Sequence, residues 1–353
     1  MSSNLSRKVQ SIAPSDLIAH SQRGPYPVGL WSFKLADPAD ADRMLPVDVW
    51  YPASPSDDET MHTPADHPLK APHRARMGLA PADGCFPLVL FSHGNSGFRR
   101  QSTFLTTHLA SWGIVVAAPD HVGNTFSDSL EIRSEEQRKS RHFEARQNRP
   151  RDMLAVADAM LASRGSCPAL DFKAIGALGH SYGGWTSLKL PALDSRICAV
   201  CGLAPASEPF VGRKAFTPGE LPFSPSLPTL FIAGLGDVLV DIETSIAPLF
   251  ERMASPSALV GIEGVDHFHF CDNIALLHGL HEKNKRPLQT RETRPYVDML
   301  SETRMHPALC ALVVSFFRSV FADEQDDPIA QFNSPGLASL DPALRLISSK
   351  SQS

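Results

Sequence analysis

The segment GALGHSYGGW (176–185) places a serine, Ser181, between Gly179 and Gly183. Apolar residues lie before and after it, as expected for a strand that turns sharply into a helix. Such a turn strains the backbone of the corner residue, and glycine on both sides removes the side chains that would collide there. The first N–H groups of the helix favour negative charge beside the corner hydroxyl. The pattern therefore predicts a nucleophilic serine, with an ordinary glycine-rich turn as the alternative interpretation.

A serine hydroxyl needs a base that activates it and a third group that orients the base. For a serine in such a turn, the expected chain order is serine, acid, histidine. The predicted strand LPTLFIAGLGD ends at Asp237, and the next strand, SALVGIEG, leads into VDHFHF, which contains His267. Because successive parallel strands end at one edge of a sheet, we predict Asp237 as the acid and His267 as the base.

Nearby residues leave alternatives open for both roles. His269 is a second candidate base, but it lies between two phenylalanines and is more typical of a packed core histidine. Asp241 is a second candidate acid, although it lies further from the end of the strand than Asp237. Glu263 and Asp266 are weaker candidates, which we interpret as solvated carboxylates.

Acyl transfer also needs hydrogen-bond donors for a developing oxyanion. One expected donor is the backbone N–H of Tyr182, which follows the serine, and the other is expected in the turn after the strand FPLVLFSHG. In SHGNSG the residue after Gly94 is Asn95, and we predict its backbone N–H as the second donor. We interpret His93 as a structural residue that shapes this turn.

Short apolar strands alternate with helical patterns along the chain, which predicts a mostly parallel sheet covered by helices on both faces. The predicted strands are 28–35, 45–52, 86–94, 114–121, 174–181, 197–205, 227–237 and 257–264. The predicted helices are 102–113, 153–163, 185–193 and 306–321. Such sheets present functional groups beyond the carboxyl ends of their strands, where the serine, the acid and the base are all expected.

The predicted elements form one catalytic domain over residues 24–322, after an N-terminal extension at 1–23. Three insertions interrupt this domain, at 127–151, 210–226 and 276–305. We expect the insertions to cross the rim above the serine as a partial lid that selects the substrate. The Ser-rich residues 323–353 are predicted as a partly flexible C-terminal tail.

The chain has 353 residues and a formal net charge of -5, so it offers no basic field for a polyanion, and nucleic-acid binding is not expected. No apolar block is long enough for a signal peptide or a membrane span, which predicts a cytoplasmic protein unless an upstream segment has been removed. Cys198 and Cys201 form a C-x-x-C within an apolar run. We interpret them as small buried side chains, with redox or metal use as the alternative.

Together these motifs resemble the α/β-hydrolase superfamily. The resemblance runs from about Gly24 to Phe321 and rests on GPYPVGLWSF, VDVWYPA, VLFSHGNSG, IVVAAPDHVGNT, GHSYGG, FIAGLGD and GVDHFHF. The groups that look most similar are the dienelactone-hydrolase-like esterases, the cutinase-type polyester hydrolases and the platelet-activating-factor acetylhydrolases.

The resemblance implies an α/β-hydrolase fold and a serine esterase that forms an acyl-enzyme with neither a metal nor an organic cofactor. By position, Ser181 matches the family nucleophile, Asp237 the acid of the cutinase-type enzymes and His267 the base. The backbone N–H groups of Asn95 and Tyr182 match the oxyanion donors. The expected partner is a small-molecule or polymeric ester.

Two departures from the family pattern narrow these expectations. Plasma-type acetylhydrolases place their acid after the strand that follows the nucleophile, where this chain has Ala204 in GLAPAS. This difference weighs against a phospholipid-acetyl substrate and favours Asp237 as the acid. Bacterial dienelactone hydrolases use a cysteine nucleophile, where this chain has Ser181. A lipase, a phospholipase-type acyl hydrolase or an amidase remains the alternative, and a ligand-binding protein without turnover is a more remote one.

Overall fold

The computed structural model describes residues 16–55, 73–163, 165, 167–283, 292–322 and 327–351. Parts of the predicted N-terminal extension, third insertion and C-terminal tail therefore lie outside the described residues.

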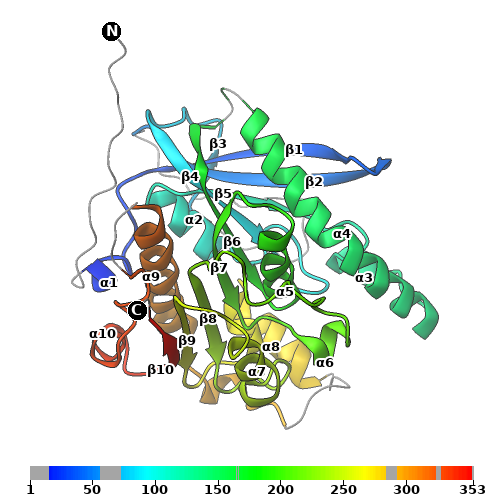
Figure 1. Ribbon diagram of the computed structural model, residues 1–353, viewed down its shortest axis with the longest axis vertical. Coiled ribbons are helices and arrows are strands. Elements are labelled where there is room, and N and C mark those ends of the chain that lie inside the picture. Colours follow the sequence, from blue (N-terminus) through cyan, green and yellow to red (C-terminus); the bar gives the residue numbers. More distant parts are fainter. Residues whose placement is uncertain are drawn as a thin grey trace.

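The strands form a single sheet. They are β1 (Val28–Asp37), β2 (Asp40–Pro52), β3 (Arg76–Met77), β4 (Cys85–Ser92), β5 (Val115–Pro119), β6 (Ala169–His180), β7 (Ile197–Leu203), β8 (Thr229–Gly234), β9 (Ser257–Ile262) and β10 (Leu344–Lys350). Their spatial order is β10-β9-β8-β7-β6-β4-β5-β2-β1-β3 (Figure 1). The strands from β5 across to β9 pair in parallel, whereas β2 pairs antiparallel with β1 and β5, and β10 pairs antiparallel with β9. This mostly parallel sheet confirms the predicted fold class.

The helices pack around this sheet. They are α1 (Asp16–Ala19), α2 (Thr103–Ser111), α3 (Phe126–Leu130), α4 (Glu135–Ala162), α5 (Tyr182–Lys189), α6 (Glu208–Val211), α7 (Ala247–Phe250), α8 (Ile274–Lys283), α9 (Glu302–Phe321) and α10 (Ser334–Leu340). Shorter helical turns include η2 (Ile242–Ile246) and η3 (His267–Phe270). Among the described helices, none is both long and apolar enough to cross a membrane.

Two glycines of β6 show that helices cover both faces of the sheet. A Cβ atom at Gly176 would lie 2.4 Å from the ring of Phe317 in α9. A Cβ atom at Gly179 would lie 2.1 Å from the carbonyl oxygen of Gly183 in α5. Residues three apart on a strand point to opposite faces, so α9 and α5 lie on opposite sides of the sheet. α2 packs on α9, and α4 packs on α5, which completes the two layers.

The helix α4 differs from its prediction. The charged insertion at 127–151 and the helix at 153–163 were expected as separate segments, but one helix runs from Glu135 to Ala162. The charged residues in its first half are good helix formers and lie mostly exposed to solvent. Only the second half buries apolar side chains such as Met153 and Val156. A change in burial along one helix was therefore misinterpreted as a boundary between two segments.

Both ends of the described chain join the fold, including residues 327–351 of the tail that was expected to be partly flexible. β10 pairs along β9, and the Lys350 ammonium donates to the carbonyl oxygens of Glu251 and Met253 at 2.9 and 2.7 Å. The strand supplies the hydrogen-bonding groups that the edge of β9 would otherwise leave unpaired. At the other end, Leu17 of α1 is buried, and Nδ1 of His20 lies 2.6 Å from the hydroxyl of Ser315 in α9.

The C-x-x-C cysteines lie in β7 as free thiols. Cys201 is fully buried, and the thiol of Cys198 donates to the carbonyl oxygen of Ile175 at 3.3 Å. Burial raises the pKa of Cys198 to about 11 and raises that of Cys201 as well, so both stay protonated near neutral pH. This environment favours the interpretation as small buried side chains over a reactive pair.

Candidate active site

Ser181 occupies the sharp turn between β6 and α5. Its φ is 57° and its ψ is -118°, a conformation that costs free energy for any residue with a side chain. The flanking glycines are required by contact, because a Cβ atom at Gly183 would lie 1.8 Å from the carbonyl oxygen of Ser92. A Cβ atom at Gly179 would in turn collide with the backbone of Gly183. The predicted steric reason for the glycines therefore applies in this turn.

Asp237 and His267 are brought together from the turns after β8 and β9. Nδ1 of His267 donates to Oδ2 of Asp237 at 2.7 Å, and both side chains are buried. The other carboxylate oxygen of Asp237 accepts the backbone N–H groups of Leu239 and Val240, each at 2.8 Å. These bonds hold the carboxylate in place, and the carboxylate in turn fixes the orientation of the His267 ring.

His267 lies next to the serine turn. Its ring centre is 4.6 Å from that of His180, the residue before Ser181. Ser181 and His267 line the same cavity, which has a volume of about 1100 Å³. Burial lowers the pKa of His180 well below the ordinary histidine value, so this neighbour is neutral and adds no charge beside His267.

The competing histidine has a structural environment. His269 is fully buried, and its Nε2 lies 3.1 Å from the carbonyl oxygen of Leu300. Its Nδ1 accepts the backbone N–H of Asp266 at 3.1 Å. Burial lowers the pKa of His269 to about 4. Both ring nitrogens are thus occupied by backbone groups, as expected for a packed core histidine.

The competing carboxylates also have other partners. Asp241 caps η2 by accepting the backbone N–H groups of the residues that follow it. Oδ1 of Asp266 accepts the backbone N–H of His267 at 2.6 Å, and Glu263 pairs with Arg345 at 3.0 Å. Asp266 is buried rather than solvated, and burial together with Asp237 raises its pKa. Of the candidate acids, Asp237 is the one whose carboxylate accepts the hydrogen bond from Nδ1 of His267.

The turn after β4, expected to supply an oxyanion donor, lies against the serine turn. A Cβ atom at Gly94 would lie 3.5 Å from Cβ of Ser181. Oε1 of Gln101 accepts the N–H of Gly94 at 2.9 Å, and its Nε2 lies 3.0 Å from Nδ1 of His180. Gln101 therefore ties the β4 turn to the end of β6. Asn95 follows Gly94 and lines the cavity.

Tyr182, the other expected donor, is the first residue of α5, and its side chain is fully buried. His93 is also fully buried, with Nδ1 at 2.7 Å from the carbonyl oxygen of Gly94. Its Nε2 accepts the backbone N–H of His121 at 3.1 Å. His93 thus shapes the turn, in agreement with its interpretation from the sequence.

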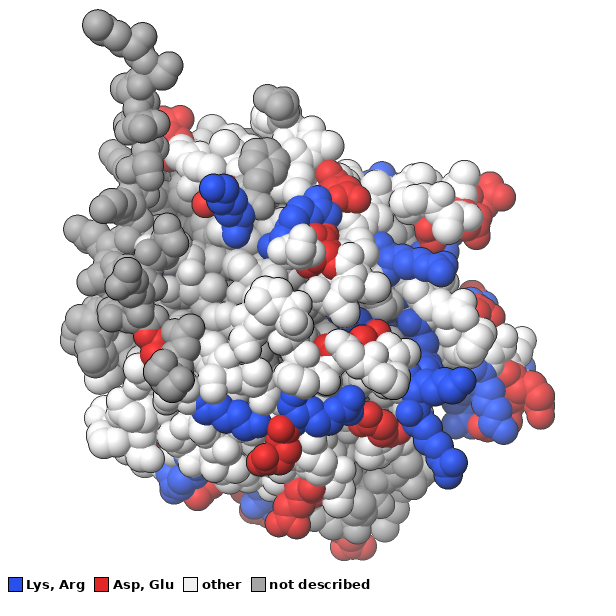
Figure 2. Space-filling model, in the orientation of Figure 1, with Lys and Arg blue, Asp and Glu red and all other residues white. Residues whose placement is uncertain are grey.

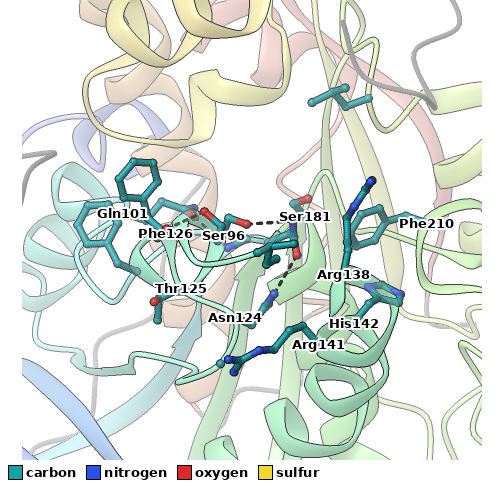
Figure 3. Close-up of a pocket in the computed structure, with 18 of the residues that line it drawn as sticks. Ser96, Gln101, Asn124, Thr125, Phe126, Arg138, Arg141, His142, Ser181 and Phe210 are labelled. Atoms are coloured by element: carbon teal, nitrogen blue, oxygen red, sulfur yellow. Dashed lines mark hydrogen bonds between the residues drawn. The ribbon is translucent and has the colours of Figure 1, made fainter. Parts of the chain in front are cut away.

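A buried arginine that was not predicted from the sequence, Arg149, lies behind this site. Arg149 has no exposed surface, and its guanidinium donates to Oγ1 of Thr186 in α5 at 3.0 Å and to the carbonyl oxygen of His93. It also donates to Oδ1 of Asn124 at 2.7 Å, and Nδ2 of Asn124 donates to the side chain of Asn95 at 2.9 Å (Figure 3). Burial lowers the pKa of Arg149 to about 10, which keeps it cationic at neutral pH.

A signal for this arginine was present in the sequence. Arg149 stands four, seven and eleven residues before Met153, Val156 and Met160, which is the spacing of one helix face. Extending the apolar stripe of that helix backwards places Arg149 on its buried side. The surrounding charged residues led instead to the interpretation of a solvated segment.

The cavity beside Ser181 receives residues from all three predicted insertions. Its apolar lining consists of Phe98, Phe126, Ile132, Phe143, Phe210, Leu239, Val240, Phe268, Leu277 and Leu280. Its charged lining consists of Arg133, Glu135, Arg138, Lys139, Arg141 and Arg146. Two further aromatic residues near the site, Trp185 and Phe270, belong to the core. Residues of each insertion therefore line the cavity that contains Ser181, while a lid that selects the substrate stays a prediction.

Comparisons with known proteins agree with this architecture. Residues 67–165 match the family model described as platelet-activating factor acetylhydrolase, isoform II. The fold also matches a ferulic acid esterase from Streptomyces cinnamoneus with a TM-score of 0.66 and 20% sequence identity, over 93% of this chain and 97% of that one. None of the curated proteins matches the chain.

The sheet order, the serine turn and the structural match show that the chain has an α/β-hydrolase fold. Residues 67–165 are similar to the platelet-activating factor acetylhydrolases, one of the groups that the sequence motifs resemble. The matched residues include the β4 turn with Asn95 and end before Ser181.

Proposed function

We propose that the protein is a serine hydrolase of carboxylic esters, with Ser181 as nucleophile, His267 as general base and Asp237 as the acid that orients the base. The observation that carries this proposal is the 2.7 Å hydrogen bond between His267 and Asp237, beside a cavity that His267 shares with the strained serine. A buried histidine held by a buried carboxylate, next to a serine in this turn, is the arrangement that nucleophilic catalysis requires.

In the first half of the proposed reaction, Oγ of Ser181 attacks the ester carbonyl carbon while Nε2 of His267 takes the hydroxyl proton. The carbonyl oxygen becomes an oxyanion, and the backbone N–H groups of Asn95 and Tyr182 donate hydrogen bonds to it. The carbon–oxygen bond to the alcohol then breaks, and His267 returns the proton to the leaving alcohol. Asp237 stabilises the imidazolium that forms between these two transfers.

In the second half, water replaces the alcohol. His267 removes a proton from the water as its oxygen attacks the acyl carbon of the ester formed on Ser181. Collapse of the second tetrahedral intermediate breaks the bond to Oγ and returns the proton to Ser181. The products are the free carboxylic acid and the unchanged enzyme.

The test is the Ser181→Ala variant, assayed with p-nitrophenyl acetate and butyrate. We expect a loss of kcat by about 10³-fold or more with an unchanged circular-dichroism spectrum, because the acyl-enzyme no longer forms. A fluorophosphonate probe should label the parent protein and leave this variant unlabelled. Undiminished turnover would assign the nucleophile to another residue, and a folded parent that neither hydrolyses esters nor takes the probe would favour ligand binding without turnover.

A phospholipase-type acyl hydrolase is the second candidate function. The match of residues 67–165 to an acetylhydrolase family and the apolar lining of the cavity favour it. The buried Ala204 at the position where plasma-type acetylhydrolases have their acid weighs against it. A series of p-nitrophenyl esters of increasing acyl length, alongside a short-chain phospholipid, separates the two candidates by their kcat/KM values.

A further inference from the structure

The cavity beside Ser181 has the opposite charge to the protein as a whole. The chain carries a formal net charge of -5, yet the cavity lining holds five basic side chains and one carboxylate, Glu135. Figure 2 shows Lys and Arg side chains gathered at the side of the molecule where α3 and α4 lie. Clustered charge of one sign at the mouth of a low-dielectric cleft raises the local concentration of ligands of the other sign.

The basic side chains belong to one segment that faces the nucleophile turn. Arg138, His142 and Arg146 are spaced four residues apart on α4, so they share one helix face. The ring of His142 lies 5.4 Å from that of Tyr182 and stacks on it, which shows that this face is turned toward the start of α5. In Figure 3, Arg138 and Phe210 lie together on one side of Ser181, with Ser96 and Gln101 on the other.

Carboxylates of the described residues neutralise only a small part of this positive charge. Arg138 pairs with Glu135, and both side chains are about half exposed. Arg146 donates to the carbonyl oxygen of Lys214 at 2.8 Å, a bond that leaves its charge uncompensated. Across the described part of the chain, Lys139 and Arg146 form no ion pair with a carboxylate. The cavity wall therefore offers cations to a ligand.

We infer that the preferred substrates are esters that combine an apolar portion with a carboxylate, which lies along α4 beside Arg138 and Arg146. The inference rests on the proposed esterase function and adds the chemical class of its substrate. The apolar lining receives the hydrocarbon part, and the guanidinium groups, which bind planar oxyanions with paired donors, receive the charge.

Matched ester pairs test this inference. The p-nitrophenyl monoester of suberic acid and p-nitrophenyl octanoate share a chain length and differ in one terminal carboxylate on the acyl side. The pair 4-acetoxybenzoate and its methyl ester places the charge on the alcohol side. We expect kcat/KM to favour the anionic member of at least one pair by about tenfold at low ionic strength, and the ratio to fall as salt is added. The pair that responds identifies which half of the substrate lies along α4.

Substitutions that lower or raise the positive charge of the cavity lining test whether these residues cause the preference for anionic esters. The double variant Arg138→Gln and Arg146→Gln should lower the anionic-to-neutral ratio by about fivefold or more, and Glu135→Gln should raise it. Lys34→Gln, which removes an exposed charge on β1 away from the cavity, should leave the ratio unchanged. The melting temperature of each variant shows that it is folded.

The outcomes separate this inference from the proposed function. If the parent hydrolyses the neutral esters but its ratio is near one and does not respond to these variants or to salt, the anionic preference is wrong and the esterase stands. If the parent hydrolyses no ester in either pair and no p-nitrophenyl acetate, the proposed function itself fails.

Discussion

The guanidinium carbon of Arg149 lies 4.7 Å from the centre of the Tyr182 ring. The same guanidinium donates to the carbonyl oxygen of His93, so one buried cation holds both turns that are proposed to bind the oxyanion. Because a guanidinium has five donors in a fixed plane, it can serve these partners together in a way that no other side chain can.

Replacing Arg149 by Met should lower kcat for p-nitrophenyl butyrate by about 10²-fold, since small displacements of positioned groups cost rates of that size. KM should change less, because the cavity lining is intact. Arg149→Lys should restore little of the loss, since an ammonium lacks the planar fork. Steady-state kinetics measure kcat and KM of each variant, and its melting temperature shows that it is folded.

Arg318→Met is the matched control for that experiment. Arg318 also lies over an aromatic ring, at 5.3 Å from the centre of Trp112, and donates to a carbonyl oxygen, but it is on α9 and outside the cavity lining. It should affect stability without lowering kcat. Equal kcat values for the Arg149→Met variant and the parent would refute a positioning role.

The two candidate acids are separated by a pair of substitutions. Asp237→Asn should lower kcat by about 10³- to 10⁴-fold, because the amide no longer holds the required tautomer of His267 or stabilises its cation. Asp241→Asn should change kcat by less than about twofold, since asparagine also caps helical turns. Stopped assays of p-nitrophenyl butyrate hydrolysis measure both, and the reverse ranking would assign the role to Asp241.

An alanine substitution should have opposite effects on stability at Gly183 in the serine turn and at Gly279 in α8. Gly183→Ala should destabilise the fold by several kcal/mol or prevent soluble expression, because its Cβ atom would lie 1.8 Å from a carbonyl oxygen. Gly279→Ala in α8 meets no atom within 4 Å and should stabilise the protein by about 0.5–1 kcal/mol through helix propensity. Urea unfolding measures both effects, and similar values for the two variants would contradict the steric argument.

Neutral buried histidines should make stability fall in acid. Burial lowers the pKa of His108 and of His269 to about 4, below the ordinary value of 6.5. The free energy of unfolding that each neutral histidine contributes is therefore fully present above pH 6.5 and is lost as the pH falls toward 4. Between pH 7 and pH 5 this loss is about 2 kcal/mol for each residue. Urea unfolding at these two pH values tests this.

His108→Gln serves as the comparison for the pH experiment. Glutamine cannot take up the proton, so the variant should lose about 2 kcal/mol less than the parent over the same interval. Its own stability at pH 7 sets the reference, because the bond from the His108 ring to the carbonyl oxygen of His20, at 2.8 Å, is also changed. An identical slope for parent and variant would show that His108 does not titrate as described.

Much of the candidate site followed from local patterns in the sequence. The glycine spacing around Ser181 reflects collisions within one turn, and the ends of two apolar strands indicated Asp237 and His267 because parallel strands end at one edge. The structure brings the latter two within 2.7 Å of each other, while their roles in catalysis stay predictions that the variants above test.

Other features depended on contacts between distant parts of the chain. The Ser-rich C-terminal segment does not read as a strand by itself, and it becomes β10 because β9 offers an unpaired edge. Arg149 lies in a charged run whose residues are individually typical of solvent-exposed helix, and it is buried because α4 crosses behind the serine turn, where carbonyl and hydroxyl oxygens accept its protons.

The sequence by itself determined the alternation of strands and helices, the strained turn and the order of the candidate catalytic residues, since each depends on neighbours along the chain. Only the tertiary structure decided which charged residues face the cavity and which face water. Helix periodicity identifies the two sides of α4, but the sheet, α5 and the β4 turn determine what each side meets.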